Sequence, residues 1–152
     1  MKLPKPKAVI FDWDNTLVDT WPIIHNALIA TQRAMGHKEW SFDETRLKVR
    51  KSMRDSFPEI FGDNWQKAGA MYQQQYRATH LEQLQALPRA QEVLEAVKRR
   101  GLYSVVVSNK KSVNLNKEVE HIGWKKWFDK VVGSDDAARD KPFVDPVHLA
   151  FE

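Results

Sequence analysis

The sequence near the N-terminus reads Lys7-Ala8-Val9-Ile10-Phe11-Asp12-Trp13-Asp14-Asn15-Thr16, an apolar run that stops at two aspartates separated by one residue. A short run of β-favouring apolar residues is typical of a strand buried on both faces. Side chains that follow such a strand lie at the carboxyl edge of a parallel sheet, where α/β proteins bind ligands. The stretch therefore predicts a buried first strand, with Asp12 and Asp14 at a functional edge.

Two more apolar runs of this kind lie downstream, at residues 103–107 and at 131–132. Apolar residues at helical spacing predict a helix over 90–97 that Gly101 closes, and another over 112–122 that Ser112 caps. Helices that alternate with strands through short links are typical of a parallel sheet covered by helices. We therefore predict an α/β fold, with an open Rossmann-like parallel sheet as its core.

Residues 20–84 contain no strand-like run. One helix is predicted to start at Thr20, a second at the capping box of Ser41 and Glu44, and a third at Trp65, after an interruption at Pro58 and Gly62. An all-helical insert is the simplest interpretation. The predicted division is a helical cap over 20–84 and an α/β core over 1–19 and 85–152.

The composition limits the class of protein. A chain of 152 residues allows one compact domain with a small inserted subdomain. Its 42% hydrophobic and 29% charged residues are ordinary for a folded soluble protein. The net charge of +4 is spread along the chain and forms no basic stripe with stacking aromatics, so nucleic-acid binding is not expected. Since there is no cysteine, disulfides, thiolate chemistry and cysteine-based zinc sites are excluded.

Neither a signal peptide nor a membrane segment is visible in the sequence. The apolar run after the basic N-terminus is too short for a signal peptide. No stretch approaches the roughly 20 apolar residues that a membrane span needs. We therefore expect a cytoplasmic protein that does not associate with membranes. The sequence does not indicate its oligomeric state.

The aspartates and two downstream residues form a candidate site. Two carboxylates of this spacing can divide a reaction between nucleophilic attack and proton transfer, and they also attract Mg²⁺. Ser108, at the end of the second strand, can donate a hydrogen bond to a phosphate, and Lys141 can offset its charge. Lys141 follows the third strand and precedes a helix that Asp145 is predicted to cap.

These residues carry a resemblance to the haloacid dehalogenase-like superfamily. That family combines a strand ending in Asp-x-Asp-x-Thr, a Ser or Thr ending the next core strand, and a downstream Lys. The corresponding stretches here are Asp12-Trp13-Asp14-Asn15-Thr16, Ser108-Asn109-Lys110 and Lys141-Pro142. The similarity covers almost the whole chain. The closest likeness is to phosphoglycolate phosphatase-like members, which have a helical cap between the first two motifs.

The resemblance implies Mg²⁺-dependent hydrolysis of a small phosphorylated metabolite through an aspartyl-phosphate on Asp12. Asp12, and Asp14 through its backbone carbonyl, would also hold the metal. The Asp14 carboxyl group would transfer protons to and from the reacting oxygens. Ser108 and Lys141 would hold the phosphoryl group, and Asn109 would contribute to substrate binding.

A basic residue of the cap often reaches the substrate in such relatives, which makes Arg54 a candidate. Arg46, Arg50 and Arg54 are spaced as on one continuous helix. Arg46 and Arg50 are interpreted as part of its solvated face.

The sequence departs from the family pattern at two places. Asn15 replaces the usual Gly, which is tolerated because Asn accepts turn conformations. The fourth, acidic motif, often Gly-Asp-x-x-x-Asp, does not occur before Glu152. In relatives this motif follows a strand that lies beside the first one, so we expect the first strand to be a sheet edge if no other strand covers it. The chain as given is therefore expected to be a fragment that lacks its C-terminal third.

Several alternatives stay open. A phosphomutase shares the motifs that are present here. Because the fourth motif is missing, the chain could instead be a catalytically inactive fragment or a binding module. A haloacid dehalogenase uses the first aspartate without the second, so Asp14 argues against that activity. The substrate itself is not indicated by any pattern in the sequence.

Overall fold

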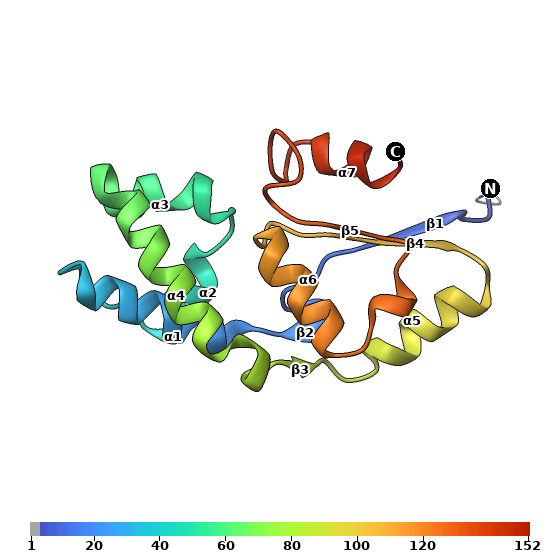
Figure 1. Ribbon diagram of the computed structural model, residues 1–152, viewed down its shortest axis with the longest axis horizontal. Helices are drawn as coiled ribbons and strands as arrows, with labels where there is room; N and C mark the ends of the chain where they lie inside the picture. The colour runs from blue at the N-terminus through green and yellow to red at the C-terminus, as the bar shows by residue number, and fades with distance from the viewer. Residues whose placement is uncertain (1–3) are drawn as a thin grey trace. The chain divides into compact units, whose positions relative to one another are not determined.

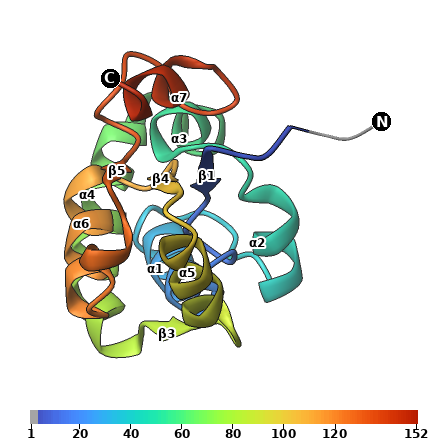
Figure 2. The same ribbon diagram turned by 90° about the vertical axis from the view of Figure 1, so that its right-hand side faces the viewer.

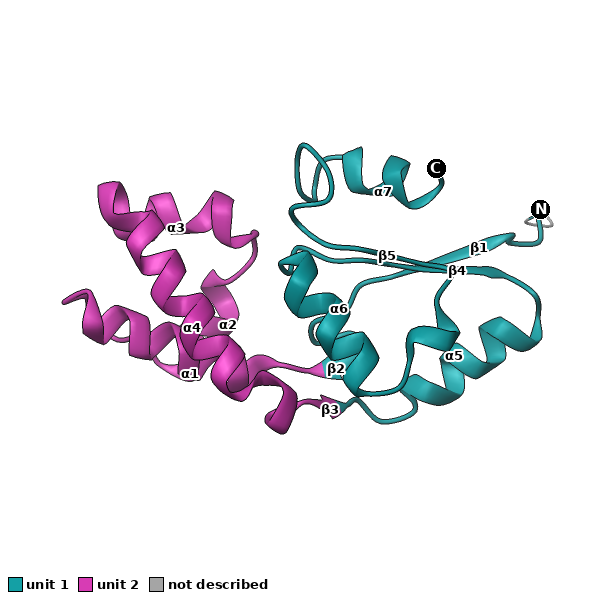
Figure 3. Cartoon of the chain, in the orientation of Figure 1, with its two compact units in different colours: residues 1–18, 86–152 teal, residues 19–85 magenta. Residues whose placement is uncertain are grey.

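The computed structural model describes residues 4–152 and divides into two compact units (Figure 1). The first unit joins the chain up to Val18 with the chain from Ala86 onwards, and the second consists of Asp19–Gln85 (Figure 3). Two short strands, β2 (Val18–Asp19) and β3 (Gln85–Ala86), pair where the chain passes from one unit to the other. No sequence signal predicted these two strands.

Three parallel strands form the sheet of the first unit, in the order β1-β4-β5. They are β1 (Ala8–Phe11), β4 (Tyr103–Val107) and β5 (Lys130–Val132). Ile10 pairs with Val105, and Val106 pairs with Val131. The three predicted strands and their parallel arrangement are thus confirmed, and the fold class is α/β.

The central strand β4 is the most buried of the three, whereas β1 is less buried than predicted. In β1, Ile10 is 43% exposed. The helices that pack on the sheet make their main contacts with β4 and β5. Because β1 lies at an edge, these helices leave part of it uncovered.

Helices cover both faces of this sheet, with α7 on one face and α5 and α6 on the other (Figures 1 and 2). Their bounds are α5 (Ala90–Arg99), α6 (Ser112–His121) and α7 (Asp145–Ala150), and a 3₁₀ turn, η2 (Lys125–Trp127), precedes β5. Val105 and Val107 of β4 form a buried cluster with Val132 and Ala150. This packing fixes α7 against the sheet.

Two of the predicted helix caps are wrong by one residue. Lys111 is the N-cap of α6 and Ser112 is its first residue, because the Ser112 hydroxyl donates to Asp136. Val144 is the N-cap of α7 and Asp145 is its first residue, because the Asp145 carboxylate accepts from Arg139.

The second unit is all helical. Its elements are α1 (Trp21–Ala34), α2 (Phe42–Lys48), α3 (Met53–Phe61), the 3₁₀ turn η1 (Gly62–Asn64) and α4 (Trp65–Gln83). α1 packs along α4, and α3 packs on the same long helix. Leu28, Phe57, Phe61 and Ala68 form its buried centre.

The predicted capping box of α2 is confirmed, but the expected continuous arginine helix is not. Ser41 and Glu44 bond to each other's backbone N–H groups, at 3.1 and 2.8 Å. The helix ends at Lys48, and α3 starts again after Ser52, whose hydroxyl is 3.1 Å from the Asp55 carboxylate. Arg54 therefore lies on a different helix from Arg46. No helix within residues 4–152 is long and apolar enough to cross a membrane.

Candidate active site

The loop after β1 is a tight turn around one carbonyl group. The Trp13 carbonyl accepts hydrogen bonds from the N–H groups of Thr16, Leu17 and Val18, at 3.2, 3.0 and 3.4 Å. Asn15 has φ = 60°, a left-handed conformation that asparagine tolerates better than most residues. This turn keeps Asp12 and Asp14 at the carboxyl end of the strand, where the sequence analysis placed them.

Asp12 combines accessibility with a cationic neighbour. One of its carboxylate oxygens lies 2.9 Å from the Lys141 ammonium, and the other accepts from the Thr16 hydroxyl at 3.3 Å. The Asp12 side chain is 43% exposed, so an incoming electrophile can reach it. A carboxylate held between a lysine and a hydroxyl at a strand end can act as a nucleophile towards phosphorus.

Asn109 brings Lys141 to this edge of the sheet. Its side-chain NH₂ donates to the Lys141 carbonyl at 3.0 Å, and its side-chain oxygen accepts from the Lys141 N–H at 2.9 Å. Both ends of the amide are therefore engaged with the backbone of Lys141. These contacts position the lysine, and the predicted part of Asn109 in substrate binding stays a prediction.

The loop that carries Lys141 is closed by an ion pair. Arg139 donates to the two carboxylate oxygens of Asp145 through Nε at 3.1 Å and Nη2 at 2.9 Å. These hydrogen bonds from Arg139 hold the pKa of Asp145 below its ordinary value. The pair spans the residues on either side of Lys141 and restricts the loop.

Ser108 lies buried at the end of β4. Its hydroxyl accepts from the Lys110 N–H at 3.1 Å, and its own N–H donates to the Val132 carbonyl at 3.0 Å. A serine hydroxyl also has one proton to donate. The structure thus places Ser108 at the same end of the parallel strands as Asp12.

Sequence reasoning missed the role of two residues, Lys110 and Glu118. The Lys110 ammonium lies 2.6 Å from Asp14 Oδ1 and 2.6 Å from Glu118 Oε2. Glu118 follows Leu115 by three residues and therefore lies on the buried face of α6. A carboxylate on an apolar helix face is the signal that could have identified this contact.

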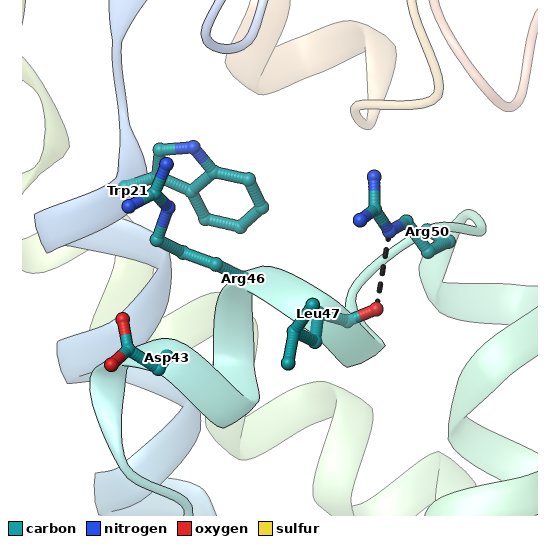
Figure 4. A pocket seen from close by; sticks show the side chains of 5 residues that line it. All are labelled: Trp21, Asp43, Arg46, Leu47 and Arg50. Atoms are coloured by element: carbon teal, nitrogen blue, oxygen red, sulfur yellow. Dashed lines mark hydrogen bonds between the residues drawn. The ribbon is translucent and has the colours of Figure 1, made fainter.

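The only other predicted site residue, Arg54, belongs to the helical unit. It is half-buried in the first turn of α3. The same unit contains a pocket of about 480 Å³. Its lining consists of Trp21, Asp43, Arg46, Leu47 and Arg50 (Figure 4).

Arg46 and Arg50 are exposed, as predicted, but both line this pocket. Arg50 Nε donates to the Leu47 carbonyl at 3.1 Å. Within residues 4–152 the Arg46 side chain takes part in no ion pair or hydrogen bond. The pocket therefore presents cationic groups beside an indole ring.

Asp12 and Asp14 are the predicted metal-binding residues at the end of β1. Within residues 4–152 no cluster of three His, Asp or Glu side chains could hold a metal ion. Mg²⁺ nevertheless commonly uses one or two carboxylates and completes its shell with water and substrate phosphate. The Asp12 carboxylate and the backbone carbonyl of Asp14 are oxygen donors that fit that requirement.

Comparisons of this chain with known protein families and sequences agree with one another. A family model for haloacid dehalogenase-like hydrolases matches residues 9–152. The chain is 28% identical over 150 residues to a phosphoglycolate phosphatase of Aquifex aeolicus, a match that covers 96% of this chain and 69% of that protein. It is 24% identical over 150 residues to the pyrophosphatase PpaX of Oceanobacillus iheyensis, with 96% and 68% covered.

Solved structures share the fold. A haloacid dehalogenase-like family protein from Streptococcus pneumoniae superposes with a TM-score of 0.84 at 24% identity, over 96% of this chain and 69% of the other. CbbY from Rhodobacter sphaeroides, in complex with phosphate, superposes with a TM-score of 0.82 at 20% identity. The match covers 97% of this chain and 72% of CbbY. The chain thus spans about two thirds of the length of these relatives.

Proposed function

Because the chain belongs to the haloacid dehalogenase-like hydrolase family, we propose that it is a Mg²⁺-dependent phosphatase of a small phosphate monoester, with Asp12 as nucleophile. The observation that carries this proposal is the accessible Asp12 carboxylate at the end of β1, 2.9 Å from the Lys141 ammonium. Its relatives include a phosphoglycolate phosphatase and a pyrophosphatase, so phosphoglycolate and pyrophosphate are the first substrates to test.

The proposed reaction has two steps. A carboxylate oxygen of Asp12 attacks phosphorus, the bond from phosphorus to the ester oxygen breaks, and that oxygen takes a proton from Asp14. A water molecule then attacks the aspartyl-phosphate and gives a proton to Asp14. The bond between Asp12 and phosphorus breaks, which releases inorganic phosphate and restores both carboxyl groups.

The remaining residues would hold the phosphoryl group. Lys141 offsets its negative charge, and Ser108 donates a hydrogen bond to one of its oxygens. Mg²⁺ held by Asp12 and Asp14 would supply further positive charge against the phosphate oxygens. We assign Asn109 to substrate binding and to the support of Lys141, and Arg54 of the helical unit to the non-reacting part of the substrate.

The test is phosphate release in the presence of Mg²⁺, combined with trapping of the intermediate. Acid quenching during turnover followed by mass spectrometry should locate a phosphoryl group on Asp12. Asp12→Asn should abolish turnover of every ester, because an amide cannot act as the attacking carboxylate.

Asp63→Asn is the matched control, since this exposed aspartate of η1 takes part in no ion pair or hydrogen bond among the described residues. Label on another residue, or full activity of Asp12→Asn, would overturn the mechanism. Transfer of the phosphoryl group to a second substrate hydroxyl would favour a phosphomutase, and phosphate binding without turnover would favour a binding module.

A further inference from the structure

A buried network of charged groups lies directly behind Asp14. The Lys110 ammonium is 2.6 Å from Asp14 Oδ1 and 2.6 Å from Glu118 Oε2, and the indole N–H of Trp13 donates to the same Glu118 oxygen at 2.7 Å. The Lys110 side chain is only 6% exposed, and Glu118 is fully buried. The ammonium is therefore held from two sides by carboxylates.

The network joins three separate parts of the first unit. Trp13 and Asp14 come from the loop after β1, Lys110 from the loop after β4, and Glu118 from the middle of α6. Trp13 is itself fully buried and packs edge-on against Trp124, with ring centroids 5.9 Å apart. The indole consequently cannot swing away from Glu118 without disturbing the core.

Packing alone does not explain this choice of residues. Taking charges out of water is energetically costly, and apolar side chains of similar volume are often equally stabilising. Buried ion pairs are better explained where they fix one arrangement among several, as a polar residue fixes register in a coiled coil. What this network fixes is the Asp14 carboxylate, whose side chain remains 22% exposed.

We infer that Lys110, held by Glu118 and Trp13, is a positioning residue that sets the direction of the Asp14 carboxylate for proton transfer. This inference rests on the proposed phosphatase function. A proton donor must lie within hydrogen-bond reach of the leaving oxygen, and a displacement of about 1 Å can cost on the order of 10²-fold in rate. Without Lys110, the Asp14 side chain can adopt other rotamers.

The kinetic test uses two substrates that differ in their need for a proton. Lys110→Met should lower kcat by about 10²-fold for an alkyl phosphate, and much less for p-nitrophenyl phosphate, whose leaving group hardly needs protonation. Asp14→Asn should show the same preference, with a loss of roughly 10²–10⁴-fold for the alkyl ester. Lys110→Met added to Asp14→Asn should cause no further loss.

A milder variant guards against misfolding. Glu118→Gln keeps an oxygen for the Trp13 N–H but removes one charge, so it should show a smaller loss with the same substrate preference. Lys117→Met and Glu120→Gln, at exposed positions of α6, are the matched controls.

A crystal structure of Lys110→Met gives a readout that does not need activity. The Asp14 side chain should occupy a new rotamer, with the backbone of the loop unchanged. An unmoved Asp14, equal losses for both esters, or additive losses with Asp14→Asn would overturn the inference while leaving the proposed function intact. If the unmodified protein hydrolyses neither ester, the proposed function fails, and the Asp14 rotamer alone then decides whether Lys110 positions it.

Discussion

Gly133, directly after β5, lies at a point of close backbone approach. A Cβ atom at this position would lie 2.5 Å from Ser112 Cα, 2.7 Å from Ser112 N and 2.9 Å from the Lys110 carbonyl oxygen. The Gly133 N–H also donates to Asp136 at 2.7 Å, which ties the glycine to its place. The start of α6 and the end of β5 can come this close only because residue 133 has no side chain.

Gly133→Ala should therefore destabilise the protein, by about 1–3 kcal/mol, because rigid backbone atoms must move to admit the methyl group. Gly69→Ala is the matched control. Gly69 lies within helix α4, and a Cβ atom there would meet only side-chain atoms at ordinary contact distances, those of Met53 at 3.5 Å and of Phe57 at 3.9 Å. It should be neutral or stabilise by up to about 1 kcal/mol, since alanine is the better helix former. Denaturant unfolding measures both free energies, and equal values for the two variants would contradict this account.

Individual site residues differ in how far the sequence reveals them. Asp12 and Asp14 could be predicted because a strand and the turn after it are local features. The left-handed conformation of Asn15 agrees with the preference of asparagine for turns. The contact between Trp13 and Glu118 joins residues 105 positions apart, and no spacing rule reports it. The catalytic roles themselves stay predictions.

At the scale of single elements, Asp129 joins β5 to its neighbours. Its carboxylate accepts from the Ser104 N–H of β4 at 2.8 Å and from the Lys98 ammonium of α5 at 3.2 Å. Its own N–H donates to the Ser104 carbonyl at 2.7 Å. The Ser104 N–H and, secondarily, Lys98 hold the pKa of Asp129 below its ordinary value of 3.8.

This shift predicts how the free energy of unfolding depends on pH. A carboxyl group whose pKa is lower in the folded state binds fewer protons there, so its contribution is complete above about pH 4. It is lost as the pH falls through the folded-state value. Asp129→Asn should therefore be less stable than the unmodified protein at pH 7, and the difference should shrink at lower pH.

Denaturant titrations at several pH values between 7 and 3 would measure this difference, with Asp63→Asn as the control. A difference between Asp129→Asn and the unmodified protein that stays constant over this range would show that the ionised carboxylate contributes nothing.

Elements with local signals were predicted better than the breaks between them. The Ser41 capping box lies within four residues, and it was correctly read. The break between α2 and α3 was missed because Arg46, Arg50 and Arg54 keep helical spacing across it. Pro58 was expected to interrupt the chain, but α3 continues to Phe61. Burial of the Phe61 side chain supplies packing that local propensity does not contain.

At the scale of the whole molecule, the α/β class followed from three apolar runs alternating with helical patterns. The periodicity of these runs does not determine which strand is exposed, because exposure depends on what packs beyond the sheet. The assignment of the helical unit as a cap over the active site is a prediction about function that neither periodicity nor the fold class tests.

The edge of the sheet gives a prediction about the behaviour of the molecule in solution. Among the described residues, β1 pairs with β4 only, so one row of its backbone N–H and C=O groups has no strand partner. Ile10, in the middle of β1, is 43% exposed. An apolar edge strand of this kind is a template for pairing with another chain, and a lysine on such an edge opposes that pairing.

We therefore expect this 152-residue chain to self-associate as its concentration rises, and we expect Ile10→Lys to reduce that association. Val93→Lys is the matched control, because Val93 is 48% exposed but lies on α5, away from any strand edge. Sedimentation velocity over a range of concentrations would report the average mass of each protein. If β1 is the contact, only Ile10→Lys shifts the distribution towards monomer, because backbone pairing needs that edge. If the chains associate through exposed apolar side chains in general, Ile10→Lys and Val93→Lys should both shift it. A mass that is independent of concentration in the unmodified protein would show that the β1 edge does not pair.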